Sequence, residues 1–202
     1  MIYLSIDIET TGLDYNNCQV LEIGAILENT DKKLDLKDIP KLRLVLIHNF
    51  IKGEPYALNM NKNLVQYIID FNLKKADDIS EYFDNLKTKV ITPNLAMEYL
   101  FNWYKLEYIA LFGCEPNNKV NVVGKNFTGF DNRFLELLPN NSGYSFHRRV
   151  LDPAILYLEK DYDEVLPDLQ TCLDRAEIEK SVAHTAVEDA WDVIQLLRNK
   201  GL

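Results

Sequence analysis

The sequence is poor in cysteine and has no long hydrophobic run, and each absence excludes a class of protein. The apolar stretches, such as residues 20–27, are far shorter than the roughly 18 residues of a membrane span, and this one contains Glu22. The three cysteines are odd in number and form no CxxC pair, which argues against a disulfide scaffold and a cysteine-based zinc site. Residues 2–6 already have a strand pattern with no basic region before them, so we expect no signal peptide. We therefore expect reduced thiols in a cytoplasmic protein.

Positive charge is also scarce. Lysine and arginine number 22 against 31 aspartate and glutamate, which gives a net charge of −9. Proteins that coat duplex nucleic acid regardless of sequence need a basic face, so this balance argues against that role. It does not exclude a nucleic-acid enzyme, because a metal site concentrates carboxylates and bound cations reverse the local field.

The composition and the hydrophobic pattern predict a folded α/β protein. With 47% hydrophobic and 26% charged residues the chain is typical of globular proteins. We expect a turn at 11–14 and a hairpin or flap at 52–61. The predicted strands are 3–8, 19–28, 42–51, 120–124 and 148–151, and the predicted helices are 63–71, 79–87, 93–112, 129–138, 166–176 and 186–198. This order favours a mixed α/β sheet with helices on both faces, in one domain of residues 1–202 in which 30–62 is a candidate hairpin or flap elaboration.

The first candidate motif is Asp7-Ile8-Glu9 at the end of the first predicted strand. Residues two apart on a strand point to the same face, so Asp7 and Glu9 project together. Two adjacent carboxylates repel each other unless a cation joins them, and a divalent metal would do so. An exposed strand end is the alternative, because a chain with so many acids contains about one Asp-x-Glu by chance.

The second candidate is Asp131, which follows the buried run at 120–124 and lies in the first turn of a predicted helix. A carboxylate at that position is favoured by the helix dipole alone, which is the structural alternative. Ligands of α/β sheets nevertheless gather at the carboxyl ends of strands, and Asp131 lies just past one.

The third candidate is His184-x4-Asp189 at the last predicted helix. Asp189 falls on the apolar side of that helix and therefore needs a partner, whereas Glu188 and Asp192 are expected to be solvated. His184 can meet Asp189 only if it lies in the loop before the helix. A histidine beside a carboxylate cluster is suited to act as a general base.

Together, four carboxylates and a histidine are the residues that two-metal phosphoryl chemistry requires, in which metals about 3.5–4 Å apart stabilise the attacking and leaving oxygens. At this point the sequence resembles a family. Three segments are similar to the motifs of the DEDDh 3′→5′ exonucleases, which include proofreading subunits, RNase T and oligoribonuclease. These segments are Asp7-x-Glu9-Thr10-Thr11-Gly12-Leu13, Asn126-x3-Phe130-Asp131-x2-Phe134-Leu135 and His184-x-Ala186-x2-Asp189.

The resemblance implies an RNase H-like fold with a mixed five-stranded sheet. It implies that Asp7, Glu9, Asp131 and Asp189 hold two Mg²⁺ or Mn²⁺ ions. His184 would remove the proton from the attacking water, and a nucleoside 5′-monophosphate would leave the 3′ end.

The resemblance also implies a substrate site beside the metals. Thr10, Thr11, Gly12 and Leu13 would hold the terminal nucleotide, with Leu13 wedged against its base, and Asn126 belongs to the second motif. Met60 lies in residues 57–61, which form either a flap over the substrate or a plain hairpin.

The substrate implied is the 3′ end of single-stranded DNA or RNA or a short oligonucleotide, and the sequence does not choose between DNA and RNA. Two other functions stay open: a non-cutting module that binds a nucleic-acid end or a protein, and a proofreading subunit of a polymerase. A homodimer is a further alternative to a monomer.

Overall fold

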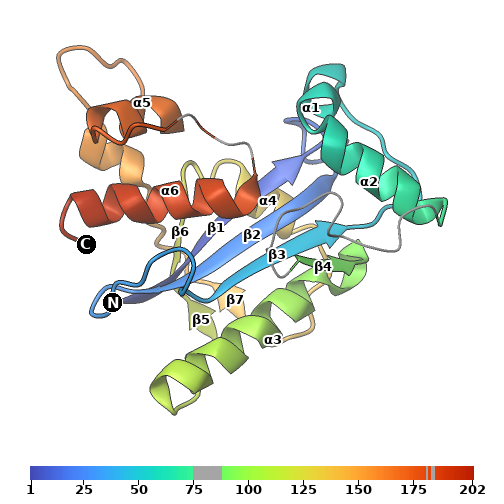
Figure 1. The fold of residues 1–202 in the computed structure, drawn as a ribbon, viewed down its shortest axis with the longest axis horizontal. Helices are drawn as coiled ribbons and strands as arrows, with labels where there is room; N and C mark the ends of the chain where they lie inside the picture. The colour runs from blue at the N-terminus through green and yellow to red at the C-terminus, as the bar shows by residue number, and fades with distance from the viewer. Residues whose placement is uncertain (75–87, 181, 183–184) are drawn as a thin grey trace.

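The computed structural model describes residues 1–74, 88–180, 182 and 185–202. At its centre lies a five-stranded sheet in the order β4-β3-β2-β1-β6 (Figure 1). The strands are β1 (Ile2–Thr10), β2 (Val20–Asn29), β3 (Lys41–Leu46), β4 (Thr88–Ile91) and β6 (Val122–Val123). β1 pairs with β2 and β2 with β3 antiparallel, whereas β6 and β4 pair parallel to β1 and β3. The predicted mixed five-stranded sheet of an RNase H-like fold is confirmed.

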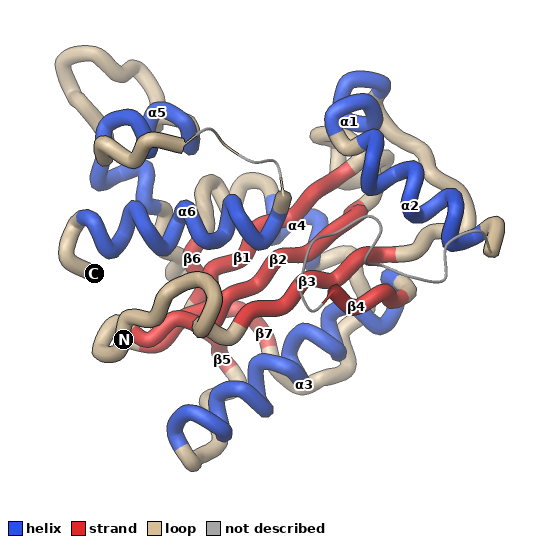
Figure 2. The backbone as a smooth tube through the Cα atoms, in the orientation of Figure 1, coloured by secondary structure: helices blue, strands red, loops and turns tan. Residues whose placement is uncertain are grey.

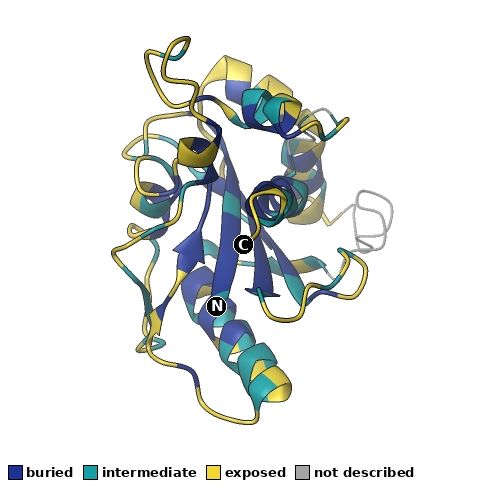
Figure 3. Cartoon of the chain, turned by 90° about the vertical axis from the view of Figure 1, so that its left-hand side faces the viewer, coloured by how far each residue is buried: buried dark blue, intermediate teal, exposed yellow. Residues whose placement is uncertain are grey.

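Helices cover both faces of this sheet, as expected (Figure 2). On one face α6 (Ala186–Asn199) packs Val187, Ala190 and Ile194 against apolar side chains of β1, β2 and β6. On the other face α3 (Pro93–Phe112) packs buried residues such as Leu100 and Phe101 against the sheet. β2 lies between the two helices, and nine of its ten residues are buried (Figure 3). Burial on both faces explains why its sequence is almost continuously apolar rather than alternating.

Most of the segment 52–61, expected to form a hairpin or flap, is helical, so the hairpin is wrong, whereas the flap stays a prediction. α1 (Pro55–Met60) begins with proline at its first turn and is followed by α2 (Lys62–Asn72). A proline at that position lacks a backbone N–H that would be unpaired anyway, and its fixed φ suits a helix start. The glycine and proline at residues 52–55 therefore mark the start of a helix and not a hairpin turn. The helix predicted at 79–87 lies outside the described residues.

The middle of the chain is less regular than its pattern predicted. The expected strand 120–124 divides into β5 (Lys119–Val120), which pairs with β7 (Ser145–Phe146), and β6, which pairs with β1. The expected strand 148–151 contributes only one bridge, between Leu151 and Val123. The helix expected at 129–138 is limited to α4 (Asp131–Leu135), and η2 (Pro153–Tyr157) is a 3₁₀ turn. These short elements depend on neighbours distant in sequence, which local periodicity does not report.

The last two helices follow prediction closely. α5 (Leu169–Arg175) begins three residues later than expected, after Asp168 caps its N-terminus by accepting from the Thr171 N–H. α6 begins at the predicted residue and ends one residue later than predicted. Among the described helices, none is both long and apolar enough to cross a membrane.

Candidate active site: a carboxylate cluster at the end of strand β1

Asp7 and Glu9 lie at the C-terminal end of β1 and point to one face of the sheet, as predicted. The same face is covered by the start of α6, where Asp189 is buried. One carboxylate oxygen from each of Asp7, Glu9 and Asp189 lies within 4.8 Å of the others. Three acids from two elements therefore share one small volume.

The close approach of α6 to the sheet depends on Gly24 of β2. This glycine pairs with Asp7 across the strands, and a Cβ placed on it would lie 2.2 Å from the carbonyl carbon of Ala186. Any larger residue would therefore push the first turn of α6 away. A second contact, from the Ser5 hydroxyl to the Ala190 carbonyl oxygen at 2.7 Å, holds the next residues of the helix.

Asp131 reaches the cluster from the other side of β1. β6 runs parallel to β1 and ends at Val123, and a Cβ on the next residue, Gly124, would lie only 2.8 Å from the Ile6 carbonyl oxygen. The loop that follows is buttressed by Asp152, whose carboxylate accepts from the Asn126 N–H at 2.8 Å. Asp131 then begins α4, is 3% exposed, and is close enough to Asp7 for its charge to act on that residue's pKa.

Burial and mutual repulsion raise the pKa values of these acids. Desolvation and then the charges of Asp131, Asp189 and Glu9 raise the pKa of Asp7 well above its usual range. Desolvation, with Glu22 as the leading charge, raises the pKa of Glu9 to about 8. Desolvation likewise raises the pKa of Asp131 to about 7. Without a cation, the cluster therefore favours bound protons at neutral pH.

The donor set of the cluster fits a divalent cation. Within the described part of the chain, no lysine or arginine is at salt-bridge distance from Asp7, Glu9 or Asp131. The Oδ1 atom of Asp131 is buried and has no hydrogen-bond partner among the residues that are placed. Converging carboxylate oxygens are the ligands that Mg²⁺ and Mn²⁺ prefer, and a bound cation would remove the repulsion that raises the pKa values.

The loop after β1 is anchored beside the cluster. Thr10 and Thr11 are buried, and the register of β1 with β2 shifts between Glu9 and Thr10. The N–H of Leu13 donates to Glu54 Oε1 at 3.1 Å, and the Glu54 N–H donates to the Thr11 carbonyl oxygen at 2.7 Å. The Leu13 side chain is left 75% exposed, as a residue that contacts a ligand would be.

Gly12 and Asn61 tighten the same loop. A Cβ on Gly12 would lie 2.6 Å from Cys18 Sγ, so the turn passes too close to its neighbours for a side chain. Asn61, just after α1, is buried and donates from Nδ2 to the Thr10 carbonyl oxygen at 3.1 Å. This contact places Met60, which is half exposed, at the end of α1 next to the loop.

Two of the predicted site residues are not brought to the cluster by any described contact. His184 lies outside the described residues, so its role stays a prediction. Asn126 is exposed with a φ of 55°, and its Oδ1 would be 2.4 Å from a Cβ on Gly129, so its side chain folds over its own loop.

One prediction about α6 is wrong. Asp192, expected to be solvated, is fully buried and accepts from Lys180 Nζ at 2.9 Å and 3.2 Å. The segment after α5 covers this side of the helix, a contact that a helical wheel of α6 alone cannot show.

Three residues beside the cluster were missed in the sequence, namely Gly24, Glu22 and Arg43. Glu22 and Arg43 form a buried ion pair at 2.7 Å next to Glu9. The polar pair within otherwise apolar strands was the available signal, because buried charges require partners.

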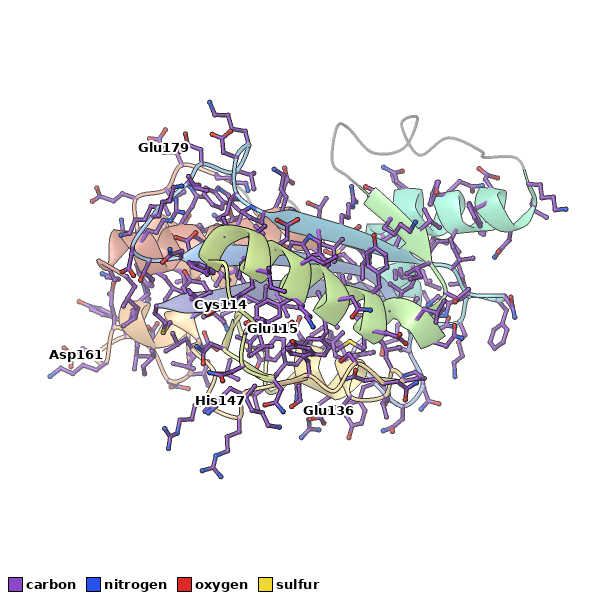
Figure 4. The ribbon with its side chains drawn as sticks, turned by 90° about the horizontal axis from the view of Figure 1, so that it is seen from below. Cys114, Glu115, Glu136, His147, Asp161 and Glu179 are labelled. Carbon is purple, nitrogen blue, oxygen red and sulfur yellow. The ribbon has the colours of Figure 1, made fainter. Side chains whose placement is uncertain are left out.

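A separate cavity of about 400 Å³ lies between α3, α4 and β7. Its lining is mixed: about half of the residues are apolar, and the polar ones include Glu136 and His147, which Figure 4 labels below α3. None of the four acids is among the described residues that line it, so it is distinct from the candidate site.

Comparison with known proteins gives one consistent result. No protein-family model matches the chain. The chain is similar to oligoribonucleases of Francisella tularensis, from subsp. tularensis and from subsp. holarctica, each 28% identical over 194 residues. The aligned part covers 96% of this chain and 90% of each relative. The protein is thus similar to oligoribonucleases over nearly its whole length.

Proposed function

We propose that this protein is a metal-dependent 3′→5′ exonuclease of the DEDDh family that hydrolyses the terminal phosphodiester of single-stranded nucleic acid. The observation that carries the proposal is the meeting of Asp7, Glu9 and Asp189 within 4.8 Å, with Asp131 beside Asp7. The raised pKa values and the absence of a described lysine or arginine partner for Asp7, Glu9 and Asp131 support a site built for cations.

The four acids would hold two Mg²⁺ or Mn²⁺ ions. Such ions supply a hydroxide-like nucleophile at neutral pH and stabilise the leaving 3′ oxygen. Of the protein's own groups, His184 would take the proton from the attacking water as the bond from phosphorus to the 3′ oxygen breaks. A nucleoside 5′-monophosphate is the product.

The loop at residues 10–13 would hold the terminal nucleotide. Its backbone is fixed by Glu54 and Asn61, and Leu13 stands exposed above it, where its side chain can pack against a base. A loop fixed before the ligand arrives loses less entropy on binding than a mobile one.

Short RNA oligonucleotides are the substrates that we favour. The relatives carry the name oligoribonuclease, and that similarity supports RNA over DNA. The net charge of −9 supports a short strand or one held only at its end, because a long strand needs a basic track.

The test is a gel time course in Mn²⁺ with 5′-labelled single strands of RNA and DNA, a 24-mer and a 3-mer of each. We expect a ladder that shortens from the 3′ end, fastest for the RNA 3-mer, and no shortening by Asp7→Ala. If wild type leaves every strand intact but retards the strands on a native gel, the proposal is wrong and the protein is a binding module. A preference for mismatched 3′ ends of primed DNA would instead indicate proofreading.

A further inference from the structure

Glu22 is a fifth acid beside the cluster, itself buried, that the proposed chemistry does not use. It lies on β2 directly opposite Glu9, and its side chain is 1% exposed. Carboxylates directly opposite on neighbouring strands repel each other. Arg43 of β3 compensates this charge, with its Nη2 at 2.7 Å from Glu22 Oε2.

The second oxygen of Glu22 holds the start of α6. Glu22 Oε1 accepts from the backbone N–H of Ala186, the first residue of the helix, at 3.2 Å. Thr185, at the N-cap position, makes no side-chain capping bond. The first N–H groups of a helix have no partner within it and favour a negative charge, so Glu22 from the sheet takes the part that a capping residue usually plays.

The position of Ala186 determines the position of Asp189. The two residues are three apart on α6, so they lie on one side of the helix about one turn apart. Gly24 lets the helix approach the sheet closely because it has no side chain. It does not fix how the helix is rotated or how far it slides along the sheet. The hydrogen bond from Ala186 to Glu22 adds direction, because it loses strength as the helix slides or rotates.

We propose that Glu22 is a positioning residue of the cation site. It fixes the first turn of α6 and so holds Asp189 against Asp7 and Glu9. Arg43 keeps Glu22 turned toward Ala186, so that this fifth carboxylate does not become a ligand itself. The inference rests on the cation site of the proposed function.

The other end of α6 offers a matched control. Glu28, also on β2 and 1% exposed, binds Arg198 near the end of α6 with Oε2 to Nη2 at 2.7 Å. This pair joins the same strand to the same helix, but about two and a half turns away from Asp189. If both pairs serve only stability, their removal should change the Mn²⁺ affinity equally. If Glu22 positions Asp189, only its removal should lower the Mn²⁺ affinity.

The test compares two double variants at the Glu22 end by calorimetric titration with Mn²⁺. Glu22→Gln/Arg43→Met keeps an oxygen that can accept from Ala186, whereas Glu22→Met/Arg43→Met has the same size and no such acceptor. We expect the Gln variant to bind Mn²⁺ within about threefold of wild type and the Met variant to bind about 10–100-fold more weakly. Glu28→Gln/Arg198→Met should bind Mn²⁺ with the affinity of wild type, even if it unfolds at a lower urea concentration.

The inference is overturned if the Met variant binds Mn²⁺ as wild type does, or if the Glu28 control weakens binding equally. It is also overturned if wild type binds no Mn²⁺. Should the Met variant not fold, Glu22→Leu/Arg43→Met replaces it. If the wild-type protein binds Mn²⁺ but shortens no strand, the proposed exonuclease activity is wrong. The positioning role of Glu22 is then still tested by the Mn²⁺ affinities of the variants. If the enzyme is active, kcat should fall in the Met variant with KM little changed.

Discussion

The strands β1 and β2 and the helix α6 contain acids of two kinds. Three buried acids have a basic partner: Glu22 binds Arg43, Glu28 binds Arg198, and Asp192 binds Lys180, at 2.7–2.9 Å. At the C-terminal end of β1 the arrangement differs, because Asp7 and Glu9 have no lysine or arginine at that distance in the described part of the chain. Among the described residues, the first region therefore contains a basic partner for each of its three acids, whereas Asp7 and Glu9 have none at salt-bridge distance.

This difference indicates what each region is for. A buried charge is costly unless it is compensated, and a fold that neutralises three acids could neutralise others in the same way. Carboxylates gathered without a basic partner instead suit a cation that comes from solution. On the proposals made above, the region around Glu22 and Arg43 would hold the helix, and the region around Asp7 would hold the ion.

The largest effect should separate Asp189 from Asp192, two buried acids one turn apart on α6. We expect Asp189→Asn to lower kcat on an RNA 3-mer by about 10³-fold or more, because a ligand of the cation is lost. Asp192→Asn should keep kcat within about threefold and lose roughly 1–2 kcal/mol of unfolding free energy, because its bond to Lys180 is weakened. Rates come from gel assays and stabilities from urea unfolding.

Equal losses of activity in both variants would contradict this distinction. In that case α6 would serve catalysis only by being folded, and Asp189 would contribute no more to the activity than Asp192 does.

The next effect is on stability against pH in the absence of metal. Glu9 and Asp131 keep their protons in the folded state up to a pKa of about 8 and about 7, whereas the unfolded chain releases them near pH 4–4.5. The folded state thus binds more protons, so the free energy of unfolding should fall as pH rises from about 5 to 8, by on the order of 6 kcal/mol. Urea unfolding in EDTA at a series of pH values measures this slope.

Millimolar Mn²⁺ should abolish that slope, since the cation replaces the protons and is bound only by the folded state. Glu9→Gln should reduce the slope without metal. A stability that rises with pH in EDTA would mean that these acids have partners that keep them charged.

A smaller effect should follow from adding a side chain at Gly24. Gly24→Ala places a Cβ 2.2 Å from the backbone of Ala186, and we expect a loss of about 1–3 kcal/mol together with weaker Mn²⁺ binding. Gly113→Ala is the matched control, because Gly113 has a φ of 68° but open space around it. It should cost about 1–2 kcal/mol through backbone strain and leave Mn²⁺ binding unchanged. Calorimetric titration measures the Mn²⁺ affinity of both variants. An unchanged affinity in Gly24→Ala would mean that α6 can shift without displacing Asp189 from the cluster.

Much of the fold could be predicted because its long elements have strong local patterns. β1 and α6 show the periodicity that burial of one face imposes, β2 has the nearly continuous apolar run of a strand buried on both faces, and α3 is a long apolar-rich segment that begins at a proline. The boundaries of these four elements agree within one or two residues. The short elements between residues 119 and 157 could not be predicted so well, because strands of two residues exist only through their partners. Of the two forms expected at 52–61, the hairpin was wrong, because Gly53 and Pro55 are consistent with either a turn or a helix start.

For the candidate site, the sequence determined which residue types exist and on which elements they lie. The pairing of Asp7 with Glu9 follows from strand geometry, and the four acids were identified by their order and context. Only the tertiary structure decided that three of them meet within 4.8 Å, that Asp192 is buried against Lys180, and that Glu22 holds the start of α6. The physical reason is that local pattern depends on the covalent chain, whereas burial and repulsion depend on which distant segments pack together, and the packing of α6 against β2 joins residues more than 160 positions apart.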